Sequence, residues 1–136
     1  MTWCRVTLTI GLRMALSEAA VQQQIMLDAP YHGATLWRNN VGACRDDTGR
    51  LIRYGLGNSS SAVTKKITSV DLVGMLNDTA QFLAIEVKRE GWKYTGTERE
   101  TAQRAFIELV QSRGGVAGFC SSLEDFRRIM RYSRCV

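Results

Sequence analysis

The segment from Phe82 to Cys120 constrains the fold more than any other part of the chain. It begins with FLAIEV, an apolar run that ends in charge, and it closes with VAGFC, a second short apolar run. Between them lies a helical pattern from about Glu98 to Arg113, which starts with Thr97 and Glu100 as a T-x-x-E capping box and is followed by Gly114 and Gly115. A strand, a helix and a strand in this order normally form a parallel pair with a right-handed crossover. The chain is therefore expected to contain a sheet with a helix packed on it.

Upstream of this unit the pattern predicts one helix and several strands. Ser17 is a suitable N-cap for a helix from about Glu18 to Asp28, which ends before Pro30. The stretch ATLWRNNV is typical of a strand, RDDTGR of a turn and LIRY of a second strand, so residues 35–54 are predicted to form a hairpin. GLGNSSSAVTKK is predicted to be a mobile loop. ITSVDLVGML is predicted to be a strand that returns through the turn NDT into FLAIEV.

The expected fold is therefore α/β, with a mixed central β-sheet flanked by helices, in the order αβββαβ with an extra C-terminal helix. Residues 17–136 are expected to form a single domain, since a chain of 136 residues suits one core. Residues 1–16 are expected to be an N-terminal extension. The alternation in RVTLTI is typical of an edge strand, but MALSEAAVQQQ from Met14 equally resembles a natural protein start, so both interpretations stay open.

Composition and charge are those of an ordinary globular protein. Hydrophobic residues make up 45% of the chain and charged residues 23%, and no apolar run approaches the roughly 20 residues that cross a bilayer. The net charge of +5 modestly favours a polyanionic partner such as nucleic acid. The four cysteines form no C-x-x-C pair and there is one histidine, so no zinc site is predicted. Free thiols in the cytoplasm are expected rather than disulfides.

The end of the FLAIEVKR strand carries an unusual group of charges. Side chains alternate along a strand, so Glu86 and Lys88 point to one face and Val87 to the other. Asp71 lies within the preceding apolar stretch, and a hairpin through NDT brings it to the same end of the sheet. Two carboxylates supplemented by a strand carbonyl suit a hard cation such as Mg²⁺, and a nearby ammonium suits a water or a charged phosphate. The alternative is a structural ion pair of Glu86 with Lys88 or Arg89 at a solvated strand end.

Two polar residues on the predicted helices belong to the same question. Glu18 lies on the helix face that carries Val21 and Ile25, where a carboxylate is unexpected. The alternative is a favourable charge at a helix N-terminus. Gln103 lies beside the apolar stripe of the helix that follows the E-x-K strand, and its alternative is an ordinary glutamine on a helix flank.

The ordered set of Asp71, Glu86-Val87-Lys88 and Gln103 resembles the D…(E/D)-x-K…Q pattern of the PD-(D/E)XK nuclease superfamily. More narrowly, the chain resembles the VRR-NUC branch, the virus-type replication-repair nuclease domain. The supporting stretches are LWRNNVGA, RYGLG, SVDLVG, FLAIEVKREG and TAQRAFIELVQSRGGVAG. With the first helix they cover residues 17 to about 130. One departure concerns the turn before Asp71, where the family often has Gly and then Ser or Pro and this chain has Thr68, Ser69 and Val70.

The resemblance implies a restriction-endonuclease-like core and a role for each matched residue. The implied ligands of Mg²⁺ or Mn²⁺ are the carboxylates of Asp71, Glu86 and Glu18, the last directly or through water, and the carbonyl oxygen of Val87. Lys88 corresponds to the catalytic lysine, and Gln103 to the glutamine that supports the site. No organic cofactor is implied.

Several basic and polar residues are candidates for contacts with a nucleic-acid backbone. They are Arg38, Asn39, Asn40, Lys65, Lys66, Arg89, Lys93 and Arg104. Trp92 and Tyr94 alternate with Lys93 in GWKYTG, a mixture suited to stacking near a phosphate. For any one of these residues, solvated surface is the alternative.

The function implied by the resemblance is metal-dependent hydrolysis of DNA. Stand-alone domains of this family resemble Holliday-junction resolvases and other structure-selective endonucleases of replication, recombination and repair. Symmetric cuts in branched DNA would require a homodimer. A phage or prophage origin is expected, with the protein in a bacterial or host cytoplasm. The alternatives are a DNA-binding module on a nuclease fold that does not cut, and a structural α/β subunit of a larger complex.

Overall fold

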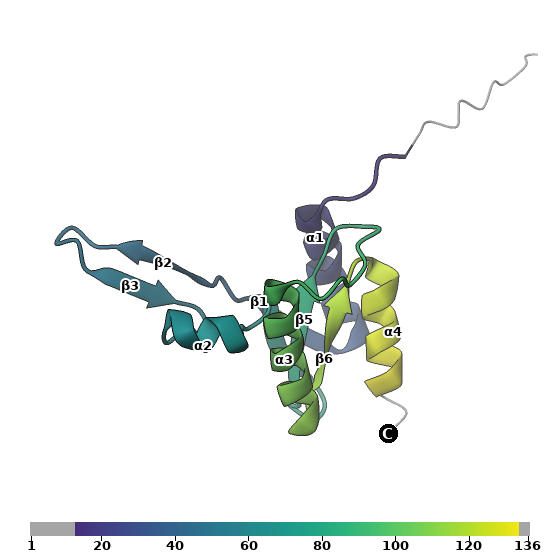
Figure 1. Cartoon of the computed structure of the whole chain (residues 1–136). Helices are drawn as coiled ribbons and strands as arrows, with labels where there is room; N and C mark the ends of the chain where they lie inside the picture. The colour runs from purple at the N-terminus through teal and green to yellow at the C-terminus, as the bar shows by residue number, and fades with distance from the viewer. Residues whose placement is uncertain (1–12, 134–136) are drawn as a thin grey trace, which may run out of the picture.

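The computed structural model describes residues 13–133 (Figure 1). Its helices are α1 (Glu18–Asp28), the short 3-10 helix η1 (Ala29–His32), α2 (Ser61–Lys66), α3 (Glu98–Ser112) and α4 (Leu123–Ser133). Its strands are β1 (Ala34–Arg38), β2 (Gly42–Arg45), β3 (Leu51–Tyr54), β4 (Leu72–Leu76), β5 (Phe82–Val87) and β6 (Val116–Cys120). None of the helices in residues 13–133 has the length and apolar character that crossing a bilayer requires.

Four of these strands form one mixed sheet in the order β1-β4-β5-β6. The pairs β1-β4 and β4-β5 are antiparallel, whereas β5 and β6 are parallel and are joined through α3. The predicted α/β class, the mixed sheet and the strand–helix–strand unit are therefore confirmed. β2 and β3 form a separate antiparallel pair.

The sheet buries a different apolar cluster on each face. On one face, Val21 and Ile25 of α1 and Phe126 of α4 share a cluster with strand residues such as Leu83 and Ile85. The other face has a smaller cluster, whose buried members are Val70, Ala84, Ile107, Val110 and Ala117. Because side chains alternate along a strand, β5 contributes to both clusters, and α3 covers the face opposite to α1 and α4.

The predicted helix ends agree with the structure. The Ser17 hydroxyl accepts a hydrogen bond from the Ala20 N–H at 3.2 Å, and the helix runs over Glu18–Asp28 as expected. Thr97 and Glu100 form the predicted capping box at the start of α3. These ends are set by local hydrogen bonds, which is why the sequence alone predicts them.

The predicted hairpin over residues 35–54 is wrong in its pairing. Residues 34–38 form β1, which joins the main sheet beside β4, because Leu36 is buried in the core there. The hairpin is instead β2 and β3, with a turn in which Asp46 accepts hydrogen bonds from Thr48 and Arg50. This hairpin, residues 42–54, projects away from the main sheet in Figure 1 and is called the arm below.

The predicted loop over residues 55–66 is also partly wrong, because it contains α2. The Ser60 hydroxyl accepts a hydrogen bond from the Val63 N–H at 3.2 Å and caps this short helix. Lys65 and Lys66 lie in its last turn, where cations are favourable. The run of serines is thus a helix start rather than a flexible spacer.

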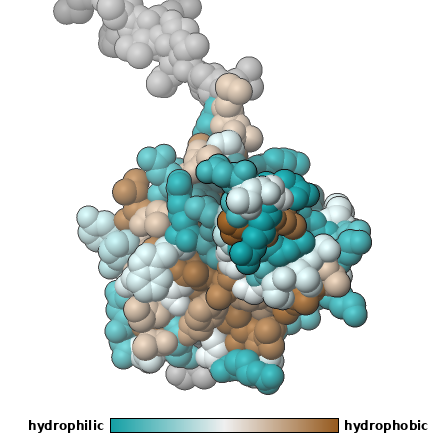
Figure 2. All heavy atoms as spheres, turned by 90° about the vertical axis from the view of Figure 1, so that its left-hand side faces the viewer, coloured by the Kyte–Doolittle hydropathy of each residue, from teal (hydrophilic) through white to brown (hydrophobic). Residues whose placement is uncertain are grey.

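The surface around the arm is not uniformly polar. Leu51, Ile52 and Tyr54 are each between 43% and 46% exposed on the arm itself. In Figure 2, where the arm points toward the viewer, hydrophobic residues are also gathered on the face below it. The arm is therefore an amphipathic projection rather than a purely hydrophilic loop.

The proposed extension over residues 1–16 lies mostly outside the described residues, and so does the predicted edge strand in RVTLTI. The last residues before α1 are described. There the Leu16 N–H donates to Glu90 at 3.1 Å, and the Glu90 N–H donates to the Leu16 carbonyl at 3.0 Å. Leu16 also packs against the main core, so the body of the molecule begins at least one residue before Ser17.

Candidate active site

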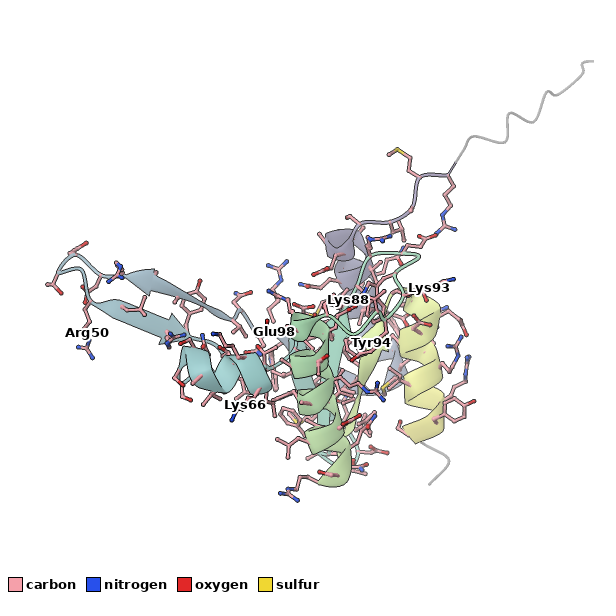
Figure 3. All side chains as sticks on the ribbon, in the orientation of Figure 1. Arg50, Lys66, Lys88, Lys93, Tyr94 and Glu98 are labelled. Atoms are coloured by element: carbon pink, nitrogen blue, oxygen red, sulfur yellow. The ribbon has the colours of Figure 1, made fainter. Side chains whose placement is uncertain are left out.

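A cleft of about 970 Å³ opens where β4 begins and β5 ends. Asp71 and Glu86 lie in it together with residues from the arm, α2 and the first turns of α3. Among the residues that line it are Gln22, Asn40, Val41, Tyr54, Lys65, Glu98, Arg99 and Gln103. Figure 3 shows Glu98 at the start of α3 and Lys66 on α2, on either side of this region. The cleft is open to solvent and large enough for a sizeable ligand.

Asp71 and Glu86 are neighbours because of the β4-β5 register. Leu72 pairs with Ile85, which places the residue before β4 opposite Glu86. The Asp71 N–H donates to Glu86 Oε2 at 3.2 Å, and the Val87 N–H donates to Asp71 Oδ2 at 3.0 Å. Each carboxylate thus accepts a backbone hydrogen bond from the opposite strand, and the structure brings both to one end of the sheet.

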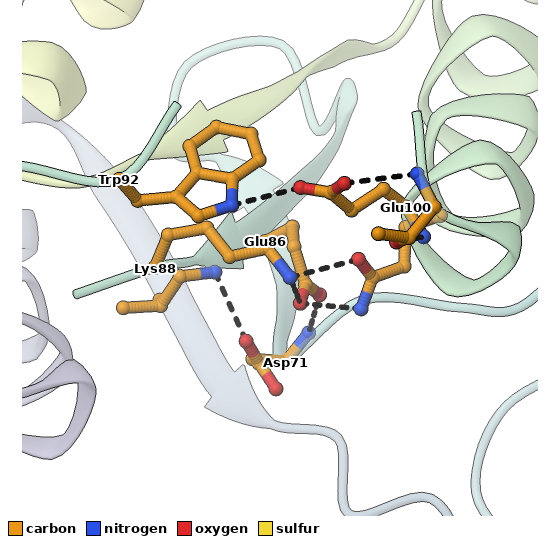
Figure 4. A network of polar contacts seen from close by, with 8 residues as sticks. Asp71, Glu86, Lys88, Trp92 and Glu100 are labelled. Carbon is orange, nitrogen blue, oxygen red and sulfur yellow. Dashed lines mark hydrogen bonds and ion pairs between the residues drawn. The ribbon is translucent and has the colours of Figure 1, made fainter. Parts of the chain in front are cut away.

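Gln103 and Lys88 complete a polar network around Glu86 (Figure 4). The Gln103 side-chain NH₂ donates to Glu86 Oε1 at 2.6 Å, and the Lys88 ammonium donates to Gln103 Oε1 at 2.9 Å. Lys88 Nζ also lies 3.2 Å from Glu86 Oε1. Glu86 and Gln103 are each only 2% exposed, so this polar network is buried beneath α3. Gln103 therefore has a structural reason for its place beside the apolar stripe.

Burial changes the acidity of Glu86. Loss of solvent, together with the nearby charge of Asp71 and against the opposing effect of Lys88, raises the pKa of its carboxyl group from 4.5 to about 8. Two carboxylates this close repel each other unless a proton or a cation lies between them. In this structure the protonated form of Glu86 is therefore favoured at neutral pH, even with the Lys88 ammonium 3.2 Å away.

An aromatic wall lies beside the Lys88 ammonium. Lys88 Nζ is 5.6 Å from the centre of the Trp92 ring and 6.0 Å from that of Phe119. Trp92 packs against Phe119 with ring centres 5.0 Å apart, and its indole N–H donates to Glu100 at 2.8 Å. The predicted stacking of Trp92 near a phosphate stays a prediction, but in this structure the ring packs within the protein.

Glu100 supports the loop that carries this wall. Its carboxylate accepts hydrogen bonds from the backbone N–H groups of Thr97 and Thr95, from the Thr95 hydroxyl and from Trp92. These contacts, the Thr97 N–H first, hold the pKa of Glu100 at about 2 despite its low exposure. Sequence analysis assigns Glu100 only to a capping box, since nothing in the spacing shows that its carboxylate also reaches Trp92.

Glu18 is not among the residues that the structure brings together. Its side chain is exposed at the first position of α1, and the residue of that helix that lines the cleft is Gln22, one turn later. Glu18 therefore stays a prediction as a metal contact. Glu18 and Gln22 are four residues apart and lie on the same helix face. Which of the two reaches the cleft depends on how α1 lies over the sheet, and the sequence does not show this.

The predicted nucleic-acid contacts divide into two groups. Asn40 and Lys65 line the cleft, whereas Arg38 and Lys66 are exposed and lie outside the lining, within two residues of it in the sequence. Asn39 also lines the cleft, but its side chain serves the fold: Nδ2 donates to Ser69 Oγ and to the Val70 carbonyl, each at 2.8 Å.

The remaining three predicted contacts lie outside the cleft lining. Arg89 and Lys93 are exposed on the loop after β5. Arg104 is held by Glu108 at 3.0 Å and lies 5.3 Å from the centre of the Tyr94 ring. By contrast, Arg99 and Tyr54 line the cleft, and sequence analysis did not select them because neither stands out from its neighbours in the sequence.

The donor atoms in the cleft fit a hard cation of the magnesium type. Within residues 13–133 no three histidine, cysteine or acidic side chains gather into a metal-binding group. Magnesium is usually held by one or two carboxylates, with waters and substrate phosphates as its other ligands, and Asp71 and Glu86 match that requirement. In comparisons with family models, curated proteins and solved structures, no match to this chain was found.

Proposed function

We propose that this protein is a metal-dependent deoxyribonuclease that hydrolyses phosphodiester bonds in an open cleft. The observation that carries the proposal is the network of Asp71, Glu86, Lys88 and Gln103. Two carboxylates from neighbouring strands meet beneath the cleft, and a lysine ammonium lies 3.2 Å from one of them. Burial raises the pKa of Glu86 to about 8, and a buried carboxyl group beside a second carboxylate and a lysine supports a functional site more than an ion pair on a solvated strand end.

The roles of the chain's own residues follow from this geometry. Asp71 and Glu86 would hold Mg²⁺ or Mn²⁺, with the Val87 carbonyl as a further candidate ligand. When bound, such a cation neutralises charge on a phosphate and lowers the pKa of a bound water. Lys88, positioned by Gln103 Oε1 at 2.9 Å, orients the water or stabilises charge on the phosphate.

The order of the elements supports a restriction-endonuclease-like core. Without the arm and α2, the chain runs α1, β1, β4, β5, α3 and β6, followed by α4. With those elements left out, the order agrees with the expected αβββαβ order and its extra C-terminal helix, and this agreement supports the proposed core. The arm and α2 are then an insertion between the first two strands of the sheet.

The proposed substrate is branched DNA, on which the protein acts as a structure-selective endonuclease similar to a Holliday-junction resolvase. The net charge of +5 and the exposed cations near the cleft support a polyanionic ligand. Symmetric cuts in a junction need two active sites, so we propose a homodimer in the cytoplasm of a bacterium or of the host of a phage.

A non-cutting DNA-binding module is the second candidate. It is favoured by the fact that Glu86 accepts hydrogen bonds from Asp71, Gln103 and Lys88, so both of its oxygens have protein partners. Such a module would bind branched DNA equally well with or without a divalent cation. It would also bind DNA normally after Asp71→Asn.

Cleavage of labelled DNA tests the proposal. Single-stranded, duplex, flap and four-way-junction DNA are incubated with Mg²⁺, Mn²⁺ or EDTA. The wild-type protein should cut in either metal and not in EDTA. Glu86→Gln and Lys88→Met should each reduce the cleavage rate by at least about 100-fold, since both remove a group from the reacting centre.

Glu124→Gln is the matched control. Glu124 is exposed on α4 and pairs with Arg131, outside the residues that line the cleft. Its variant should cut at the wild-type rate. A folded wild-type protein that cuts none of the four DNAs in either metal, or a Glu86→Gln variant that cuts normally, would contradict the proposal.

A further inference from the structure

We propose that Tyr54 is a stacking platform for an unpaired DNA base in the cleft. This inference rests on the proposed function in one respect, because it takes DNA to be the ligand of the cleft. It concerns binding alone and requires no cleavage. It also names the feature of branched DNA that the protein recognises, namely bases that have left the duplex stack.

The first observation is the position of the Tyr54 ring. Tyr54 is the last residue of β3 and pairs with Gly42 across the arm. A Cβ atom at Gly42 would lie only 2.7 Å from Cζ of Tyr54, so the end of the ring occupies the space that a side chain there would take. Even so, Tyr54 is 46% exposed, and it lines the cleft. One part of the ring is therefore supported by backbone while the remainder is open to a ligand.

The second observation is that the base of the arm is fastened to the active site. The Asn58 side-chain NH₂ donates to the carbonyl oxygens of Gly42 and Tyr54, at 2.7 and 2.9 Å. Asn39 Oδ1 accepts from the Leu56 N–H at 2.9 Å, and the Asn39 N–H donates to the Asp71 carbonyl at 2.7 Å. A short chain of hydrogen bonds thus holds the backbone of Tyr54 in a fixed relation to that of Asp71, and the ring lies against Gly42. A rigid ring loses little entropy when a base stacks on it.

The third observation is the charge around the ring. Lys65 of α2 and Arg99 of α3 are exposed cations that line the same cleft as Tyr54, and Val41 is an apolar residue of that lining. Three acidic residues also line the cleft, namely Glu98, Asp71 and Glu86. Two cations and an open aromatic ring in one cleft match a nucleotide, because its phosphates need positive charge and its base needs a flat apolar face.

An open aromatic ring together with cations in one cleft favours unpaired bases over paired ones. In a duplex each base is already stacked between its neighbours, so its face is not available to a protein ring, whereas bases in flaps and single strands can stack on an aromatic side chain. The ring itself provides the contact, so the phenol hydroxyl is not required.

Equilibrium binding in EDTA tests the inference without any cleavage. Fluorescence anisotropy of labelled single-stranded and duplex DNA of the same sequence is measured with the wild-type protein, Tyr54→Phe and Tyr54→Ala. We expect Tyr54→Ala to weaken single-strand binding by roughly tenfold or more, and duplex binding by less than about twofold. Tyr54→Phe should bind both DNAs within about twofold of the wild type, because the ring is retained.

Two further variants distinguish loss of the ring contact from a general folding defect. Tyr31→Ala removes a tyrosine that is 87% exposed on η1, outside the cleft lining, and should leave binding unchanged. Gly42→Ala keeps Tyr54 but introduces the Cβ atom that displaces its ring, and it should lose single-strand affinity as Tyr54→Ala does. A 2-aminopurine base in the single strand gives a second signal: stacking quenches it in the wild type and Tyr54→Phe, but not in Tyr54→Ala.

The outcomes separate this inference from the proposed function. If Tyr54→Ala binds single strands normally, or loses single-strand and duplex binding equally, the platform is refuted, whether or not the protein cuts DNA. If the selective loss is seen but the wild type cuts nothing in Mg²⁺ or Mn²⁺, the platform stands and the nuclease proposal fails.

Discussion

At the scale of single residues, the site combines features that stabilise the fold with one that destabilises it. Gln103 and Lys88 satisfy Glu86 with hydrogen bonds, but burial and the charge of Asp71 still oppose ionisation of Glu86. Functional sites often retain such an unfavourable group because the ligand relieves it. Under the proposed function, Glu86 is therefore the residue at which metal binding and stability should conflict most clearly.

This conflict predicts a dependence of stability on pH. The pKa of Glu86 is about 8 in the folded protein and near 4.5 when unfolded, so between these values the unfolded chain binds fewer protons and stability falls as pH rises. Glutamine resembles the protonated acid. In EDTA, Glu86→Gln should therefore raise the free energy of unfolding by about 1–3 kcal/mol at pH 8 relative to the wild type, and by much less at pH 5.

Urea unfolding of both proteins at pH 5 and pH 8 measures this difference. Glu108→Gln, an exposed substitution on α3, is the control and should show no such change between the two pH values. An equal difference between wild type and Glu86→Gln at pH 5 and pH 8 would show that Glu86 ionises normally in the folded protein.

The candidate site was predictable at this scale only where residues are close in sequence or share a strand. The alternation of Glu86 and Lys88, and the hairpin that brings Asp71 beside them, follow from the period of a β-strand. The positions of Tyr54 and Arg99 in the cleft could not be predicted in this way. They reach the cleft from the arm and from α3, and the directions of these elements depend on tertiary packing.

At the scale of elements, prediction succeeded where local signals set the boundaries and failed where pairing is long-range. The capping box and the two glycines set both ends of α3, and both signals are visible in the sequence. The strand ATLWR was assigned to the nearest following strand, whereas its partner is β4, more than thirty residues onward. Burial of Leu36 decides that pairing, and burial is a property of the whole sheet.

Asn39 joins three elements, which gives a prediction at this scale. Its side chain bonds to Ser69, to Val70 and to the Leu56 N–H, and so connects β1 with the segments on both sides of α2. Asn39→Ala should lower the free energy of unfolding by roughly 1–3 kcal/mol, since it leaves partly buried polar groups without partners. It should also expose the arm and α2 to limited proteolysis, because they lose their link to the sheet.

Asn40→Ala provides the comparison for this experiment. Asn40 is the exposed neighbour of Asn39, so its replacement should leave both the urea midpoint and the proteolysis rate near those of the wild type. If the two variants behave alike, Asn39 does not hold the arm.

At the scale of the whole molecule, the sheet separates a well-covered face from a more open one. α1 and α4 cover the first face, and they are joined by a bidentate pair in which Arg127 donates to both oxygens of Asp28, at 2.9 and 3.1 Å. The cleft, the arm and α2 lie toward the other side with α3. The larger core thus lies under α1 and α4, and the solvent-open cleft lies near α3, α2 and the arm.

The two described cysteines lie in these two different environments, so their reactivity with a thiol reagent compares the core with the arm. Cys120 is buried in the well-covered core, and burial raises the pKa of its thiol, whereas Cys44 is exposed on the arm. Iodoacetamide should therefore modify Cys44 quickly in the native protein and Cys120 only when the molecule unfolds, as followed by mass spectrometry of peptides. Comparable rates for the two thiols under native conditions would show that the core opens locally around β6.

The anchoring of the arm at Asn39 and Ser69 has a consequence for how this chain can change over generations. The whole insertion, residues 42–66, leaves and rejoins the sheet beside the same two anchoring side chains. The insertion can therefore change in length and in the sequence of its tip, while the strands next to Asp71 and Glu86 keep their register. A change confined to one contiguous stretch of coding sequence can thus alter the residues that the arm and α2 contribute to the cleft and leave Asp71 and Glu86 in place.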